Sequence, residues 1–397
     1  MTSHAFTVPP ELERCPFMPV FGPPQVMFVR GEGTELWDST GQRYLDFLCG
    51  LAVTSLGHAH PAVTEALCRQ AATLLHVSNF YANPVATEAA RQVDALVGEA
   101  AGTGGQVFFC NSGAEANECA LKLARKHGGH GRYAVVSTYG SFHGRTLAAL
   151  AATGQPAKHE PFAPMPDGFR HVAWNDLDAL AAAIDPSVAA VLVEPVQGEG
   201  GVHPADADFF TGVRQLCDER GLLMIVDEVQ TGFARTGRWF GFEHYGVAPD
   251  VVTLAKAMGN GVPVGACWAR ADVAAAFAPG DHGSTFSGTA IATAAVLAVI
   301  EEMRRIDAPQ LAEKQGARLQ AGLRTLPGVV DVRGLGLLLA AELEPGREAK
   351  AVYESALARG LVTNAVTPTA LRLAPPITVS DDEIDEAVGI LAEVLAA

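Results

Sequence analysis

The sequence predicts an α/β protein with a mostly parallel sheet and a second, smaller α+β domain. Short apolar runs alternate with amphipathic segments between residues 106 and 269, a pattern typical of helices that cover both faces of a parallel sheet. Beyond about residue 290, longer helical patterns replace this alternation. The 397 residues, 49% of them hydrophobic, are enough for two or three domains with deep cores.

The chain starts with a Pro-rich arm, followed by a predicted hairpin at residues 33–47 around the turn Ser39-Thr-Gly-Gln42. Helical periodicity then covers residues 61–76 and 86–101, and Pro61 suits a first helical turn. We expect the hairpin to be an edge element of the small domain and to pack with the C-terminal region, although periodicity alone does not establish this contact.

The large sheet is predicted from apolar runs that are too short for helices and rich in β-branched residues. These strands are Gln106–Cys110, Tyr133–Ser137, Ala189–Glu194, Leu222–Asp227, Val251–Leu254 and Val264–Ala269. The amphipathic segments Ala114–His127 and Asp206–Arg220 lie between them.

The C-terminal part is predicted to be a helix-rich α+β domain. Its expected helices span 290–305, 310–326, 349–359 and 381–395, and its strands lie around 329–332 and 337–343. We therefore predict an N-terminal arm and hairpin at 1–56 that join the small domain, a large domain at 57–285, and the small domain itself at 286–397.

Composition and charge exclude several classes of protein. With 28 Lys and Arg against 44 Asp and Glu, the net charge is −16, which repels nucleic acid. No apolar stretch approaches the roughly 20 residues that a membrane span requires, and residues 1–21 lack the apolar core of a signal peptide. The seven cysteines form no C-x-x-C pair, so we expect free thiols and a cytoplasmic protein.

The segment Asn111-Ser-Gly-Ala-Glu-Ala-Asn117 places small polar residues between a predicted strand and a helix. Backbone N–H groups and the helix dipole at such a junction favour a phosphate. The alternative is an ordinary helix cap in which Ser112 and Glu115 form a capping box, and this motif alone does not decide between the two.

Two acidic residues, Asp227 and Glu228, end the apolar strand at 222–227. Ligands of open α/β sheets collect at the carboxyl ends of strands, where a buried acid needs a cationic partner. An Asp that caps the next helix is the alternative. A pair of acids after an apolar strand favours a cationic heterocycle as the ligand.

Lys256 lies among apolar residues after the strand at 251–254. A single lysine is usually solvated, but these neighbours indicate an apolar pocket, where desolvation frees the amine for Schiff-base chemistry. A phosphate cradle, an acid for a ring nitrogen and such a lysine are the protein groups that pyridoxal phosphate requires.

These residues belong to a longer series of motifs, and with them the chain resembles class III pyridoxal-phosphate aminotransferases, above all the acetylornithine and ornithine aminotransferase subgroup. The resemblance runs from about Met18 to the C-terminal region, and the order of the motifs makes chance implausible. The motifs are Leu36-Trp-Asp38, Gly57-His-Ala-His-Pro61, Asn111-Ser-Gly-Ala-Glu-Ala-Asn117, Ser141-Phe-His-Gly-Arg-Thr146, Glu194-Pro-Val-Gln-Gly-Glu-Gly200, Asp227-Glu-Val-Gln-Thr-Gly232, Leu254-Ala-Lys-Ala-Met-Gly259 and Ser284-Thr-Phe286.

The resemblance implies fold type I of the pyridoxal-phosphate enzymes and a homodimer with a shared active site. It implies that Lys256 carries the cofactor and moves the substrate proton, and that Asp227 keeps the pyridine nitrogen protonated. Phe142 and Val229 would press on the two ring faces. The implied cofactor-binding residues are Ser112, Gly113, Ala114, Phe142, His143, Asp227, Val229, Gln230 and Lys256, with Thr285 reaching the phosphate from the partner subunit.

The resemblance also implies two arginines for substrates. Arg145 would hold the α-carboxylate of an ω-amino donor, and Arg372 the carboxylate of 2-oxoglutarate. Glu199 would mask Arg372 while the donor is bound. Ser284 and Phe21 complete the implied substrate site.

The sequence departs from the family in a few places. Phe21 stands where relatives often carry Tyr, Ser287-Gly-Thr-Ala-Ile291 replaces the usual Gly-Gly-Asn-Pro-Leu, and Asn260 replaces a common Gly. The departures leave the cofactor chemistry intact and bear on the identity of the donor.

Four histidines invite a metal interpretation: His58, His60, His127 and His130. No carboxylate or third histidine accompanies either pair at matching spacing, so loop and cap roles are favoured and we predict no metal site.

The resulting hypothesis is an aminotransferase that moves the ω-amino group of N-acetylornithine to 2-oxoglutarate, a step in arginine biosynthesis. Ornithine, succinyl-diaminopimelate and 4-aminobutyrate are alternative donors. A decarboxylase or an aminomutase of the same fold is a second alternative, and neither needs Glu199 to face Arg372. A cofactor-binding regulatory protein is a third, disfavoured because both Lys256 and Asp227 are present.

Overall fold

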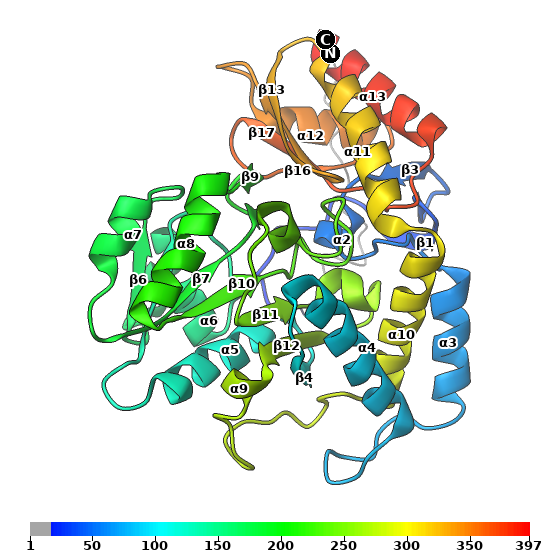
Figure 1. Cartoon of the computed structure of the whole chain (residues 1–397). Coiled ribbons are helices and arrows are strands. Elements are labelled where there is room, and N and C mark those ends of the chain that lie inside the picture. The colour runs from blue at the N-terminus through cyan, green and yellow to red at the C-terminus, as the bar shows by residue number, and fades with distance from the viewer. Residues whose placement is uncertain (1–16) are drawn as a thin grey trace.

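The computed structural model describes residues 17–397, so the start of the Pro-rich arm and Cys15 lie outside the described residues. Its largest element is a seven-stranded sheet with the order β4-β12-β11-β10-β7-β5-β6 (Figure 1). The strands are β4 (Gly105–Cys110), β5 (Ala134–Thr138), β6 (Phe169–Val172), β7 (Val188–Val193), β10 (Leu223–Asp227), β11 (Val251–Leu254) and β12 (Gly265–Arg270).

The predicted α/β class and mostly parallel sheet are confirmed, with one exception in direction and one added strand. Strands β5, β6, β7, β10 and β11 are parallel, whereas β12 is antiparallel to both β11 and β4. Sequence patterns missed β6, because its residues are only half buried at the sheet edge and include Arg170 and His171, which break the apolar run.

Helices cover both faces of this sheet, as the alternation of side chains along its strands requires. Ile225 packs in one apolar cluster with helix α5 (Gly113–Gly128), while its neighbours Met224 and Val226 pack in another with α8 (Ala207–Arg220) and α10 (Ala290–Arg305). Helices α3 (Pro61–Ala71) and α4 (Pro84–Ala101) contact α10. In Figure 1, α10 (yellow) runs beside α3 (blue).

The predicted first helix is shorter than expected. Periodicity extended it to His76, but α3 ends at Ala71, and the Gln70 side chain donates a hydrogen bond to the Leu74 carbonyl. This contact satisfies a backbone acceptor beyond the helix and holds the chain in a turn.

The shorter helices of the large-sheet region are α6 (Leu147–Ala152), α7 (Leu177–Ala183) and α9 (Ala271–Ala274). A separate two-stranded sheet pairs β8 (Val196–Gln197) with β9 (His203–Pro204).

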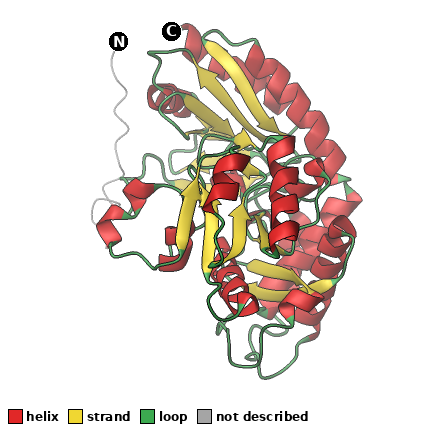
Figure 2. Ribbon diagram, turned by 60° about the vertical axis from the view of Figure 1, so that its left-hand side comes forward, coloured by secondary structure: helices red, strands yellow, loops and turns green. Residues whose placement is uncertain are grey.

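The remaining elements form two four-stranded sheets with three helices. One sheet has the order β13-β14-β17-β16 and the other β1-β2-β3-β15. In the second sheet the N-terminal hairpin joins the C-terminal region, because β3 pairs in parallel with β15. The elements are β1 (Phe28–Glu32), β2 (Glu35–Asp38), β3 (Arg43–Asp46), β13 (Val329–Leu335), β14 (Leu338–Leu343), β15 (Leu361–Val362), β16 (Asn364–Ala365), β17 (Ala370–Leu373), α11 (Ala308–Arg324), α12 (Ala349–Ala358) and α13 (Asp381–Ala396). Figure 2 shows helices along the strands of both parts of the molecule.

Two connections matter for the site. Residues 255–264 join β11 to the antiparallel β12 without a crossover, so they stay at the sheet edge where β10 ends. A left-handed turn, α2 (Cys49–Ala52), has positive φ angles throughout, from +53° at Cys49 to +75° at Leu51. Non-glycine residues reach this region only when their surroundings enforce it.

Three features of residues 17–397 concern thiols, membrane-spanning helices and metal ligands. The cysteines in this range are free thiols. None of its helices has the length and apolar character to cross a membrane, and it contains no cluster of three potential metal ligands.

Candidate active site

The loops that follow β4, β5, β10 and β11 converge on a cavity of about 400 Å³. Carboxyl ends of neighbouring strands meet at one edge of an α/β sheet, which is where such proteins bind ligands. The cavity brings together most of the predicted cofactor residues. It is lined by Ser112, Gly113, Ala114, Phe142, His143, Arg145, Asp227, Val229, Gln230 and Lys256.

The start of helix α5 forms one wall. Ser112 is the N-cap, and its hydroxyl accepts a hydrogen bond from the Glu115 N–H at 3.2 Å. Ser112 is thus a helix cap, but the expected capping box is not formed, because the Glu115 carboxylate accepts from the Asn111 N–H at 2.7 Å and not from the Ser112 N–H. The cap leaves the phosphate interpretation open, since Gly113 and Ala114 line the cavity. A Cβ on Gly113 would lie 2.7 Å from the Val229 side chain, so only glycine fits beside Val229.

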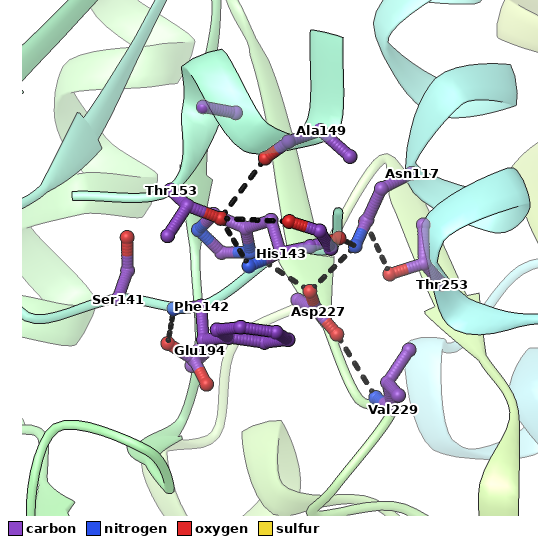
Figure 3. A network of polar contacts seen from close by, with 12 residues as sticks. Asn117, Ser141, Phe142, His143, Ala149, Thr153, Glu194, Asp227, Val229 and Thr253 are labelled. Atoms are coloured by element: carbon purple, nitrogen blue, oxygen red, sulfur yellow. Dashed lines mark hydrogen bonds and ion pairs between the residues drawn. The ribbon is translucent and has the colours of Figure 1, made fainter. Parts of the chain in front are cut away.

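Asp227 lies at the centre of a buried polar network (Figure 3). Its Oδ2 accepts hydrogen bonds from Asn117 Nδ2 and His143 Nδ1, both at 2.8 Å, and its Oδ1 accepts one from the Val229 N–H at 3.0 Å. The Thr253 hydroxyl donates to Asn117 Oδ1 at 2.9 Å, which orients the amide nitrogen towards Asp227. The carboxylate is thus fixed in place facing the cavity.

Lys256 stands at the start of the 255–264 connection with a backbone φ of +50°. Burial lowers the pKa of its ammonium to about 8, against the opposing effect of the Glu199 carboxylate. A larger fraction of the amine is therefore neutral near physiological pH than for an exposed lysine. The strained backbone holds the amine at the cavity, as is common at functional sites.

Glu194 is a second acid at the cavity that sequence patterns did not single out as a site residue. Its carboxylate accepts a hydrogen bond from the Phe142 N–H at 3.2 Å. Burial, with the Asp227 charge nearby, raises the pKa of Glu194 well above its ordinary value. Burial and the Asp227 charge thus favour the neutral form of the Glu194 carboxyl.

Arg372 and Glu199 form an ion pair beside the cavity. Arg372 Nη1 donates to Glu199 and, at 3.2 Å, to Gln230 Oε1, while its Nε donates to Asn364 Oδ1 at 3.1 Å. Burial opposes ionisation of Glu199, but the Arg372 charge outweighs it and lowers the pKa of Glu199. Arg372 is 1% exposed, and its Nη2 has no hydrogen-bond partner among the described residues.

Arg145 offers the other cationic group. Its guanidinium carbon lies 5.6 Å from the centre of the Phe142 ring, and the side chain lines the cavity from an exposed position. Within residues 17–397 no carboxylate is within ion-pair distance of it. An exposed arginine without an acidic partner is suited to bind an anionic substrate group.

Besides Glu199 and Arg372, which lie beside the cavity, three predicted residues do not line the cavity of their own chain. Phe21 is 88% exposed, and Thr285 lies in an exposed turn. The Ser284 hydroxyl accepts a hydrogen bond at 3.2 Å from Nδ2 of Asn111, which lines the cavity, but Ser284 itself does not line it. Their proposed roles therefore depend on a second subunit.

The family departures have local structural roles. Asn260 adopts a left-handed conformation, accepts a hydrogen bond from the Leu56 N–H at 2.8 Å and donates to the Gly57 carbonyl at 3.0 Å. The Ser287 hydroxyl donates to the Phe109 carbonyl.

The two histidines of the Gly57-His-Ala-His-Pro61 motif pair with acids. His58 pairs with Asp46, and His60 pairs with Glu302.

Sequence reasoning missed Asn117, Thr253 and Val53 as site residues. Asn117 had a usable signal, because it lies one helical turn after Gly113 and therefore on the same face of α5. Val53 lines the cavity but follows the left-handed turn, and no sequence period predicts that turn.

The residues present fit pyridoxal phosphate. Asp227 is buried with no Lys or Arg partner in the described chain, so it can pair with a protonated ring nitrogen. The amides of Gly113 and Ala114, the apolar surfaces of Phe142 and Val229, and the Lys256 amine line the same cavity. This set supplies an anion site, ring contacts and a nucleophile.

Comparisons with known proteins agree with this chemistry. The model of the class-III aminotransferase family matches residues 20–395. The acetylornithine aminotransferase of Caldanaerobacter subterraneus subsp. tengcongensis is 48% identical over 379 residues, which cover 94% of this chain and 95% of that protein. The acetylornithine aminotransferase of Methanocaldococcus jannaschii is 42% identical over 397 residues, which cover 97% of each chain.

Solved structures show the same architecture. The ornithine aminotransferase from Toxoplasma gondii has a TM-score of 0.88 at 34% identity, over 93% of this chain and 90% of that chain. The N-acetylornithine aminotransferase from Stenotrophomonas maltophilia has a TM-score of 0.81 at 33% identity, over 94% and 96%. Since the family model spans almost the whole chain, and the fold and cavity match the chemistry of that family, this chain belongs to the class-III aminotransferases.

Proposed function

We propose that the protein transfers the ω-amino group of N-acetylornithine to 2-oxoglutarate, giving the semialdehyde and glutamate. The observation that carries this proposal is one cavity lined by Lys256, Asp227 and Arg145, with the ion pair of Arg372 and Glu199 beside it. Within residues 17–397, Arg145 has no ion-pair partner. The curated relatives, 42–48% identical, are acetylornithine aminotransferases.

Pyridoxal phosphate supplies an electron-withdrawing ring when it is bound. Gly113 and Ala114, at the N-terminus of α5, bind its phosphate through backbone N–H groups. Asp227 holds a proton at the ring nitrogen, and its hydrogen bonds to Asn117 and His143 keep it in position. Lys256 binds the cofactor through Nζ. The same amine then moves the proton of the substrate carbon that carries the transferred amino group.

The two arginines take the two substrates in turn. Arg145 binds the α-carboxylate of the donor, which leaves the ω-amine directed towards Lys256. Glu199 neutralises Arg372 at this stage. When 2-oxoglutarate enters, Glu199 moves aside and the Arg372 guanidinium binds a carboxylate of the acid.

We further propose that the enzyme is a homodimer with a shared active site. Thr285 is exposed and does not line the cavity of its own chain, so it is accessible to the phosphate bound by a second subunit. Ser284 and Phe21 contact substrate in the same assembly.

The divisions at residues 57 and 286 remain our proposed domain limits. The free cysteines of residues 17–397 support a cytoplasmic location.

The test is a set of steady-state rates with 2-oxoglutarate as acceptor. The donors are N-acetylornithine, ornithine, succinyl-diaminopimelate and 4-aminobutyrate. We expect kcat/KM for N-acetylornithine to exceed the others by at least about tenfold, equivalent to ~1.4 kcal/mol of transition-state binding. A higher value for another donor would reassign the substrate. Absence of glutamate formation with every donor would contradict the aminotransferase proposal.

A further inference from the structure

Arg235 is a fully buried arginine outside the cavity lining, with an exposed fraction of 0%. It follows β10 by a few residues, beyond Gln230. Its Nη1 donates to the carbonyls of Leu337, at 3.2 Å, and Pro375, and its Nη2 donates to the Ser55 hydroxyl at 2.7 Å. One side chain thus joins three segments that are far apart in the sequence.

The environment of this guanidinium is costly for a cation. Burial lowers the pKa of Arg235, and Cys49 and Asp46 oppose this effect. Within residues 17–397 it forms no ion pair with a carboxylate, and its Nε has no hydrogen-bond partner. A buried, unpaired charge destabilises the fold, so a positional role is the natural reason for it.

The segments that Arg235 joins carry the acceptor side of the site. Leu337 precedes β14, and Pro375 follows β17. These two strands pair with each other, and Ala340 is the register partner of Arg372. Arg235 therefore contacts the strand pair at one end, where β14 begins and β17 ends.

The backbone reinforces this attachment. The Leu337 N–H donates to the Arg235 carbonyl at 3.0 Å, and the Ile377 N–H donates to the Ser55 carbonyl at 2.7 Å. At Gly336, where φ is +52°, an added Cβ would lie 2.4 Å from the Thr236 backbone. The chain before β14 thus packs directly on the residues that flank Arg235.

We propose that Arg235 is a positioning residue that fixes the β14–β17 strand pair, and with it the Arg372 guanidinium, relative to Gln230 and the cavity. The topology explains why Arg235 affects the binding of 2-oxoglutarate and not that of the donor. Arg145 lies on the loop after β5, which has no contact with Arg235 in the hydrogen-bond network. Loss of the Arg235 contacts therefore displaces Arg372, which binds 2-oxoglutarate. Arg145, which binds the donor, stays in place.

The effect on binding 2-oxoglutarate rests on the function proposed above, whereas the effect on the strand pair does not. The first experiment therefore uses hydrogen exchange of the cofactor-loaded protein and needs no substrate. In Arg235→Lys, which keeps the charge but loses the planar fork, we expect amide exchange at 337–343 and 370–377 to accelerate at least fivefold. Unchanged exchange at both segments overturns the inference.

Arg214→Lys is the matched control. Arg214 is a mostly buried arginine that pairs with Asp250 and contacts the Ala248 carbonyl in the large sheet region. The same substitution there should leave exchange at 337–343 and 370–377 unchanged. Equal acceleration in both variants would indicate general loosening and would overturn the specific role of Arg235.

The second experiment separates the two half-reactions in single turnovers. Arg235→Lys should raise the half-saturating concentration of 2-oxoglutarate about tenfold, with less than a twofold change for the donor. Equal losses in both half-reactions overturn the positioning role. If Arg235→Lys does not fold, Ser55→Ala, which removes one hydrogen bond to the guanidinium, should change both readouts in the same direction. A wild-type enzyme inactive with these substrates would contradict the proposed function, and the exchange experiment would still test Arg235.

Discussion

The Glu199 carboxylate forms an ion pair with Arg372, and Arg372 is almost completely buried in this arrangement. Gln230 contacts both side chains, accepting from Arg372 Nη1 at 3.2 Å and donating to Glu199 Oε1 at 3.4 Å. The positive charge of Arg372 is therefore neutralised before any substrate binds. Access of an acceptor carboxylate to Arg372 requires Glu199 to leave.

Replacement of this acid is expected to change the choice of donor. In Glu199→Ala the Arg372 charge is unmasked, so α-amino donors such as glutamate gain a carboxylate partner. We expect the ratio of kcat/KM for glutamate to that for N-acetylornithine to rise at least about tenfold, or ~1.4 kcal/mol. Glu342→Ala, which removes an acid paired with Arg333, is the control. Equal slowing with both donors would leave Glu199 with a structural role only.

Asp227 is expected to control the chemistry of the cofactor ring beyond its retention. Asp227→Asn keeps the size of the side chain but removes the charge that favours a protonated ring nitrogen. With cofactor saturation verified by absorbance, kcat should fall by at least about a hundredfold. The adjacent Glu228, whose carboxylate accepts from Gly241 and Phe242 N–H groups, provides the control Glu228→Gln. Full activity of saturated Asp227→Asn would refute this role.

The pH dependence of cofactor uptake should reflect the buried amine. Burial lowers the pKa of Lys256 to about 8, and only the neutral amine attacks an aldehyde. The uptake rate of pyridoxal phosphate by cofactor-free protein should rise about tenfold per pH unit below pH 8 and level off above it. Pyridoxamine phosphate has no aldehyde, so its uptake should lack this dependence.

The identity of the lysine that binds the cofactor is tested with a variant and with the cofactor-loaded wild type. Lys256→Ala should keep the fold, measured by thermal unfolding, and lose turnover. Borohydride reduction of the loaded wild type followed by peptide mass analysis should place the pyridoxyl group on Lys256. A label on another lysine would refute the assignment.

The shared active site is tested by mixing two inactive variants. If Thr285 acts across the interface, a heterodimer of Lys256→Ala and Thr285→Glu contains one complete site, because intact Lys256 and Thr285 come from different chains. Activity should therefore recover when the unfolded variants are refolded together, and stay low for each variant alone. If Thr285 acts within its own chain, or the protein is a monomer, mixing restores nothing.

Most of the large sheet was predictable, because buried parallel strands are continuous apolar runs. Strand β11 has the predicted bounds, and β10 begins one residue later than expected. The direction of β12 was not predictable, because an apolar run indicates a buried strand but not whether that strand is parallel or antiparallel to its neighbours. Strand β6 was missed because its side chains are only partly buried at the edge.

Local patterns identified the cavity residues that belong to a strand–loop–helix junction, such as Gly113, Asp227 and Lys256. They did not identify contacts between distant segments. Asn117 supports Asp227 from another element, and Arg235 reaches Ser55 and Pro375. Such partners depend on tertiary packing, which leaves no period in the sequence.

The antiparallel direction of β12 has a consequence for heat resistance. The lysine is held on a short return between two central strands, both fully buried at their paired residues. Lys256 follows the last ladder residue of β11 by two positions, so the ladder restrains its backbone. Such core ladders open only with free energies close to that of global unfolding. We therefore expect the lysine to stay in place up to the melting temperature, and inactivation by heat to follow the loss of the whole sheet.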